Sequence, residues 1–193
     1  MNVKPAKIVA HLLCWLPVGY LVVAVSTRNL GADPQERVMH LLGYWGLLFL
    51  LLGLAITPAR RLLKVSWLFQ FRRMLGLYAA FYLVLHITTF TLFYLNLNLS
   101  ELWSETIQRP YISVGMLGFM LIIPLVLTST KTMQKRLGRN WAKLHRLVYL
   151  IAVLGIIHFV WQSKADLNEP LSYALVLIVL LGVRVYWYLR KRK

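Results

Sequence analysis

The sequence predicts an all-α integral membrane protein, a bundle of six transmembrane helices with both termini in the cytoplasm. Of the 193 residues, 59% are hydrophobic and only 15% are charged, and the charges gather in short patches between long apolar runs. Runs of this length span a hydrocarbon core of roughly 30 Å at about 1.5 Å per residue. A net charge of +16 would also fit nucleic-acid binding. The basic residues, however, lie at the ends of the apolar runs, which is typical of membrane proteins.

Six apolar runs are long enough to cross a membrane, and they cover residues 8–26, 38–56, 74–94, 111–128, 147–162 and 171–188. We expect helices because every backbone polar group in lipid must be satisfied within its own segment. The first run is interpreted as a retained helix and not a cleaved signal peptide, since Cys14, Trp15 and Pro17 lie inside it. The connections are too short for a separate domain, and we identify no internal repeat.

Basic and acidic residues alternate from one connection to the next. The segments before the first run, between runs two and three, between four and five, and from run six onward hold 18 of the 22 basic residues and no acid. Basic loops face the cytoplasm in most membrane proteins. The pattern therefore predicts an even number of spans with both ends inside. The other three connections hold all six acids: Asp33, Glu36, Glu101, Glu105, Asp166 and Glu169.

Ionisable side chains inside membrane spans are functional candidates because they are costly there. The predicted spans contain no acid, which argues against a proton relay built from carboxylates. The single cysteine, Cys14, excludes an iron–sulfur cluster held by cysteines of this chain alone. The five histidines are therefore the main candidates.

Two histidines lie at matching depths on parallel spans. His86 lies 13 residues beyond Arg73, and His158 lies 13 residues beyond His145, which corresponds to about 20 Å of helix in each case. Both spans run from inside to outside, so the two imidazoles should lie together in the outer half of the membrane. Two axial ligands of one haem iron require this arrangement. The alternative is that each histidine hydrogen-bonds to a neighbouring helix without any cofactor.

His145 and Arg73 form a second depth-matched pair, at the predicted cytoplasmic face. His145 could ligate a second haem, and Arg73 could bind a propionate or a phosphate. Thirteen residues of ideal helix turn by about 140°, however, so His145 and His158 do not share a helix face. The alternative is that both residues simply belong to basic loops. His11 and His40 lie at helix ends, where histidines are ordinary, although His40 could approach a haem edge or a periplasmic partner.

Several motifs resemble those of the MsrQ (also called YedZ) family, the haem-binding membrane subunits of bacterial periplasmic methionine sulfoxide reductase systems. That family is grouped with the ferric reductase and NADPH oxidase transmembrane domains. The motifs that carry the resemblance are GADP at 31–34, ITP at 56–58, RRMLG at 72–76, His86, RPY at 109–111, TST at 128–130, MQKRLG at 133–138, Trp141, Leu144-His145, Val148-Tyr149 and His158.

The resemblance implies a single ferric reductase-like transmembrane domain over residues 1–193, in the bacterial inner membrane. It implies haem b between helices three and five, with His86 and His158 as axial ligands of the iron and His145 as the ligand of a possible second haem. The implied role is to pass electrons from the quinone pool or a cytosolic flavin reductase to a periplasmic molybdopterin-containing methionine sulfoxide reductase. Such a subunit carries electrons and does not itself transform the substrate.

The chain departs from the wider oxidase pattern in two places. Those proteins carry a second histidine on helix three where this chain has Arg73, which argues for one bis-histidine haem and not two. They also carry a cytoplasmic flavin and nucleotide domain that this chain lacks, so any electron donor is a separate molecule. The MsrQ family is associated with FMN, and no glycine-rich phosphate loop marks its site here. The basic loops around Arg72, Arg73, Arg136 and Arg139 could hold its phosphate.

Two other classes of function remain open from the sequence. One is a ferric or quinone reductase membrane domain with a different electron acceptor on the same scaffold. The other is a transporter or structural membrane subunit without a cofactor. An absorption spectrum of the purified, dithionite-reduced protein distinguishes the haem proteins from the cofactor-free class.

The charge pattern predicts the topology directly. A reporter enzyme that is active only in the periplasm should work when fused after Glu101 and fail when fused after Arg136 or at Lys193. The measurement is reporter activity in cells, normalised to the amount of fusion protein. The reverse result would overturn the predicted orientation.

Overall fold

The computed structural model describes residues 3–163 and 166–191, and the fusion point at Lys193 lies outside the described residues. Within these residues six helical segments are long and apolar enough to cross a membrane. The predicted fold class, an all-α protein with six transmembrane helices, is confirmed. The main helices of these segments are α1 (Lys4–Ser26), α2 (Pro34–Leu63), α3 (Phe71–Leu95), α5 (Pro110–Leu127), α8 (Leu147–Gln162) and α9 (Asn168–Arg190).

The helix α2 begins four residues before the predicted span because its N-terminus is capped. The carboxylate of Asp33 accepts a hydrogen bond of 3.0 Å from the Glu36 backbone N–H, and Pro34 occupies the first position of α2. The expectation that all six acids lie in loops is wrong for four of them. Glu36 and Glu169 lie in the first turns of α2 and α9, and Glu101 and Glu105 lie in the short helix α4 (Leu99–Gln108). The remaining elements are short: η1 (Ser66–Gln70), α4 (Leu99–Gln108), α6 (Lys131–Leu137) and α7 (Arg139–Leu144).

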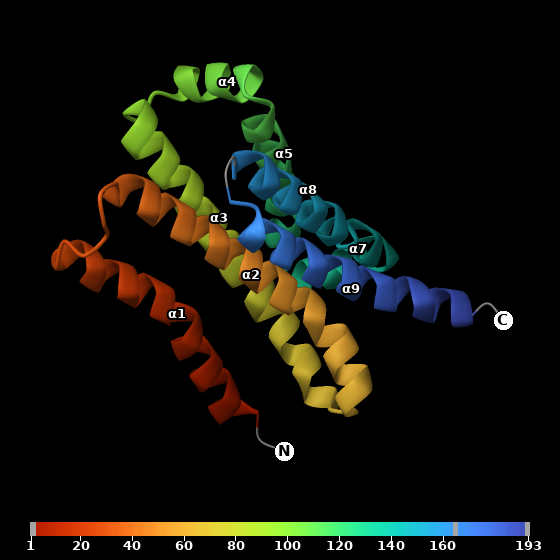
Figure 1. Cartoon of the computed structure of the whole chain (residues 1–193). Coiled ribbons are helices and arrows are strands. Elements are labelled where there is room, and N and C mark those ends of the chain that lie inside the picture. The colour runs from red at the N-terminus through yellow and green to blue at the C-terminus, as the bar shows by residue number, and fades with distance from the viewer. Residues whose placement is uncertain (1–2, 164–165, 192–193) are drawn as a thin grey trace.

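Two antiparallel helix pairs form the centre of the bundle. The helix α2 packs along α3, and α5 packs along α8 (Figure 1). The helix α4 crosses from the end of α3 to the start of α5, at the top of the view in Figure 1. The helix α1 lies at one side, where the Tyr82 hydroxyl donates a 2.7 Å hydrogen bond to the Cys14 carbonyl. The helix α9 lies against α2 and α8.

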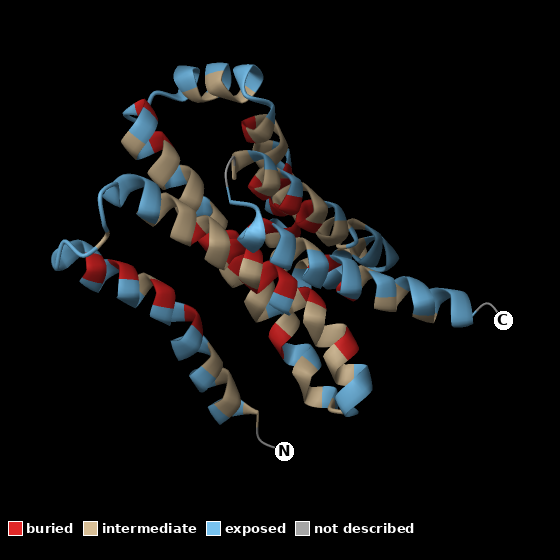
Figure 2. Ribbon diagram, viewed as in Figure 1, coloured by how far each residue is buried: buried red, intermediate tan, exposed pale blue. Residues whose placement is uncertain are grey.

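Buried residues concentrate where α2, α3, α5 and α8 meet, as the red segments in Figure 2 show. Small side chains allow close approach there, and both Ala79 and Ala152 are fully buried. The outward faces of α1 and α9 carry many exposed apolar side chains, including Leu12 and Ile178. In a protein with six candidate spans, these faces are suited to contact with lipid.

The charges segregate to the two ends of the bundle. We call the end at which α2 begins and α3 terminates the acidic end, because it carries Asp33, Glu36, Glu101, Glu105, Asp166 and Glu169. We call the opposite end the basic end, because it carries Arg60, Arg61, Lys64, Arg72, Arg73, Lys131, Lys135, Arg136, Arg139, Lys143, Arg146, Arg190 and Lys191.

Candidate functional site

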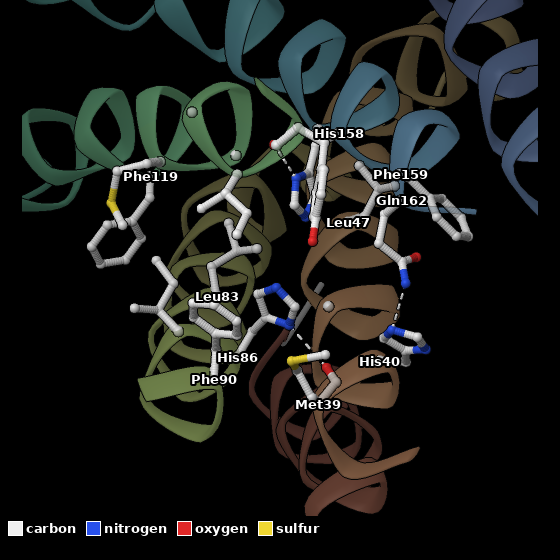
Figure 3. A pocket seen from close by; sticks show the side chains of 18 of the residues that line it. Met39, His40, Leu47, Leu83, His86, Phe90, Phe119, His158, Phe159 and Gln162 are labelled. Atoms are coloured by element: carbon white, nitrogen blue, oxygen red, sulfur yellow. Dashed lines mark hydrogen bonds between the residues drawn. The ribbon is translucent and has the colours of Figure 1, made fainter. Parts of the chain in front are cut away.

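The imidazoles of His86 and His158 face each other between α3 and α8. Their ring centres lie 6.2 Å apart, and the two ring planes are nearly perpendicular, at 81°. Figure 3 shows both rings pointing into one cavity from opposite sides. The two residues that the sequence placed at equal depth are thus brought together by the fold.

Each imidazole is held by a backbone carbonyl of the adjacent helix. The Nδ1 atom of His86 lies 2.9 Å from the Met39 carbonyl oxygen on α2, and Nδ1 of His158 lies 2.7 Å from the Tyr111 carbonyl oxygen on α5. A carbonyl oxygen only accepts, so Nδ1 carries the proton in each ring. The Nε2 atoms then keep their lone pairs, which is the protonation state of a metal-binding histidine.

Two glycines make these contacts possible. A Cβ atom on Gly43 would lie 3.1 Å from Nδ1 of His86, and one on Gly115 would lie only 2.7 Å from Nδ1 of His158. Gly43 is four residues after Met39, and Gly115 is four residues after Tyr111. In a helix the carbonyl of one residue points toward the residue four positions on, so a side chain there would block access to the carbonyl.

The rings line a cavity of about 310 Å³ between α2, α3, α5 and α8. Its volume lies at the lower end of the range for cofactor clefts, roughly 300 to 1,000 Å³. Most of the wall is apolar, and it includes Leu47, Leu83 and Phe119. Polar side chains, among them His40 and Arg109, line the cavity toward the acidic end.

The spacing of the rings fits two ligands of one metal ion. Imidazoles bound on opposite sides of a metal have ring centres about 6.4 Å apart, for a metal–nitrogen bond of about 2 Å and about 1.2 Å from nitrogen to ring centre. Among the described residues, no group of three or more His, Cys, Asp or Glu side chains could hold a metal ion. The two facing imidazoles and the apolar wall fit a haem, whose macrocycle supplies the remaining ligands of its iron.

His145 and Arg73 are not part of this cavity. His145 lies between α7 and α8, stacks on Trp141 at 4.1 Å, and has its Nε2 atom 3.0 Å from the Thr128 hydroxyl. Arg73 is exposed, whereas the neighbouring Arg72 is half-buried and interacts electrostatically with His145. At the basic end Arg72 and His145 are therefore both partly buried, whereas Arg73 is exposed.

Comparison with known proteins places this geometry in a family. Residues 42–156 match the model of the ferric reductase like transmembrane component. A protein of Herminiimonas arsenicoxydans is 47% identical over 180 residues, which cover 92% of this chain and 83% of that protein. A protein of Xanthomonas euvesicatoria is 42% identical over 202 residues, which cover 100% of this chain and 91% of that protein. Both are named protein-methionine-sulfoxide reductase heme-binding subunit MsrQ. This chain belongs to the MsrQ family.

A third MsrQ protein, from Caulobacter vibrioides, is 44% identical over 176 residues, which cover 91% of this chain and 84% of that protein. No solved structure gives a significant match to the chain.

The structure reveals an internal repeat that the sequence analysis missed. The pairs α2–α3 and α5–α8 each contain a carbonyl, a glycine and a histidine in the same order and with the same spacing. Only these few positions carry the repeat, and 43 residues separate each glycine from its histidine, so composition and periodicity do not reveal it. A shift of 72 residues relates the two sets: Met39 to Tyr111, Gly43 to Gly115 and His86 to His158.

Sequence reasoning also missed the polar mouth of the cavity. His40 and Gln162 are joined by a 2.8 Å hydrogen bond between α2 and α8 (Figure 3), and both residues also line a second, outer cavity of about 540 Å³. Glu36, Asp166 and Glu169 line this outer cavity as well. The expectation that His40, at a helix end, could approach a haem edge or a periplasmic partner was the signal in the sequence that pointed to this mouth.

Proposed function

We propose that this MsrQ family member is a haem b electron-transfer subunit of the bacterial inner membrane, in which one haem lies between His86 and His158. The observation that supports this proposal most strongly is the pair of carbonyl-anchored imidazoles 6.2 Å apart. The name of its relatives as heme-binding subunits of protein-methionine-sulfoxide reductase is consistent with it. We propose that residues 1–193 form one ferric reductase-like transmembrane domain around this site.

The proposed acceptor is a periplasmic molybdopterin-dependent methionine sulfoxide reductase that repairs oxidised periplasmic proteins. The proposed donors are the quinone pool or a cytosolic flavin reductase, with FMN as a further carrier. The haem iron supplies one-electron chemistry when it is bound. The chain itself orients the ligand lone pairs, through the carbonyls of Met39 and Tyr111, and surrounds the cofactor with an apolar wall.

Removing either axial ligand should abolish or severely reduce haem binding. We expect His86→Ala and His158→Ala to lose most of the haem, because one imidazole cannot form a six-coordinate low-spin site. The measurement is the absorption spectrum of the purified, dithionite-reduced protein, with haem content expressed per mole of chain. His11→Ala is the control, since His11 bonds to the Tyr78 hydroxyl on the α1 side of the bundle. Normal low-spin spectra in both cavity variants would contradict the assignment.

A methyl group at Gly115 should disturb the site without removing a ligand. The new Cβ atom in Gly115→Ala would lie 2.7 Å from His158 Nδ1, so the ring must move and its hydrogen bond to Tyr111 must lengthen. We expect a several-fold fall in haem content. Gly182→Ala is the matched control, because no atom lies within 4 Å of its added Cβ and both changes raise helix propensity equally. Equal haem content in the two variants would show that the glycine contact is unimportant.

Electron transfer across the membrane needs a carrier at each end, because aliphatic side chains cannot conduct across about 30 Å of hydrocarbon. We propose that the haem near the acidic end delivers electrons to the periplasmic partner, which docks on the acidic residues. Redox partners commonly meet through small interfaces guided by complementary charge. We propose an inner carrier close to Arg73 and His145 at the basic end, which is a flavin, a quinone or a second haem. If His145 ligates a second haem through Nε2, the contact of this atom with Thr128 must break.

The two ends should be separable in function. Neutralising Glu101, Glu105, Asp166 and Glu169 together should slow electron delivery to the partner and weaken its salt dependence, while haem reduction from the cytoplasmic side stays unchanged. Replacing Arg73 or His145 should instead slow haem reduction by the cytoplasmic donor, while the haem between His86 and His158 stays bound. Stopped-flow absorption of the haem measures both steps. Native rates of haem reduction in the Arg73 and His145 variants would refute the inner carrier.

A further inference from the structure

The short helix α4, Leu99–Gln108, lies across the ends of two spans at the acidic end. The helix α3 ends before it at Leu95, and α5 begins after it at Pro110. Both of these helices extend from the same side of α4 (Figure 1). Because α3 and α5 belong to candidate membrane spans, α4 lies near the level at which the hydrocarbon ends, with the spans on one side and water on the other.

Both ends of α4 are held by hydrogen bonds. The Asn98 side chain caps its N-terminus and accepts a 3.1 Å hydrogen bond from the Ser100 backbone N–H. Near its other end, the Ser113 hydroxyl of α5 donates to the Thr106 carbonyl. These contacts fix how α4 is rotated about its own axis, so each of its faces has a defined direction.

One face of α4 exposes three large apolar side chains. Leu99, Trp103 and Ile107 are 72%, 64% and 65% exposed, and we call these three residues the apolar stripe. They follow one another at intervals of four residues, so they lie side by side along the helix. A contiguous exposed apolar surface of this kind marks contact with another protein or with a membrane.

The other faces of α4 show where the stripe points. Leu102 and Thr106 are half-buried against the bundle, and Leu102 lines the cavity between the two histidines. At about 100° per residue, the apolar stripe lies next to these two residues around the helix. Ser104 and Gln108 are exposed and lie on the side opposite to the bundle. The polar side of α4 therefore faces away from the spans, and the stripe lies at the flank beside them.

Lipid fits this flank better than a soluble protein does. A protein that approaches from water first meets the polar side, which includes Glu101 and Ser104. The stripe instead lies beside the spans, and the nearby end of α3 also exposes apolar side chains, Leu92 and Tyr94. Tryptophan is enriched at the hydrocarbon boundary, and short helices with one apolar and one polar side lie in that boundary. The helix contains no Lys or Arg, so apolar contact and not attraction to anionic headgroups must hold it there.

We propose that α4 is an interfacial helix whose apolar stripe inserts into the lipid boundary at the acidic end. Its polar side then faces water, and its third side, with Leu102, forms part of the cavity wall. The insertion does not depend on the haem assignment, because it rests on the faces of α4 and on the direction of the two spans.

The test uses single cysteines on two sides of α4 in the full-length protein. Leu99→Cys and Ile107→Cys place a thiol on the apolar stripe and leave Trp103 in position. Ser104→Cys is the matched control on the polar side of the same helix. Cys14 is buried, and the unchanged chain measures any labelling of that residue. Each variant is labelled with a thiol-reactive fluorophore and placed in nanodiscs of neutral phosphatidylcholine, and circular dichroism checks that it is folded.

Two quenchers report where each label lies. Iodide quenches a fluorophore in water, and phosphatidylcholine with a nitroxide on its acyl chain quenches one in lipid. We expect the lipid nitroxide to quench the labels at positions 99 and 107 several-fold more strongly than the label at position 104. We expect iodide to show the reverse order, because the two sides of an interfacial helix lie in different media.

The proposal is overturned if iodide quenches positions 99 and 107 as strongly as position 104 and the lipid nitroxide does not quench them. The stripe would then lie in water, where it would be available to a soluble protein. Equal quenching of all three labels by the lipid nitroxide would also overturn the proposal, since α4 would then have no side that faces water.

Discussion

The central part of this bundle depends on two places where an imidazole ring lies directly against the backbone of a neighbouring helix. A ring can reach a carbonyl inside a helix only if the residue one turn further on has no side chain, and Gly43 and Gly115 meet this requirement. The contact holds α2 against α3 and α5 against α8 at close range. It also fixes which nitrogen of each ring points into the cavity, and so determines the chemistry available there.

Lipid does not favour the burial of apolar side chains between helices, since the hydrocarbon around the protein is equally apolar. The structure accordingly uses small residues and hydrogen bonds where helices meet. Ala79 and Ala152 allow close packing, the Tyr82 hydroxyl joins α3 to α1, and Arg184 joins α9 to α2. The large apolar side chains of α1 and α9 mostly face outward. The polar groups therefore provide much of the specificity of the bundle.

The repeat of two helix pairs explains why the imidazoles face each other across one cavity. Each pair contributes the same carbonyl, glycine and histidine, so each presents a ring to the other. The same shift of 72 residues relates Arg73 to His145, so the two pairs differ at the basic end. His145 there contacts Thr128 and Trp141, and Arg73 faces outward. The repeat thus makes a matched site near the acidic end and leaves unlike residues at the basic end.

The sequence alone determined the six spans, the segregation of charge and the equal depth of His86 and His158, because these follow from local hydrophobicity and from counting residues along a helix. It did not determine which helix faces which. The glycines at 43 and 115 look like ordinary helix glycines until a ring is found 43 residues further along the chain, against each of them. The hydrogen bond from Arg184 to the Leu54 carbonyl was likewise decided by the packing of α2 and α9. Such contacts join residues far apart in the chain, and no periodicity within a single helix encodes them.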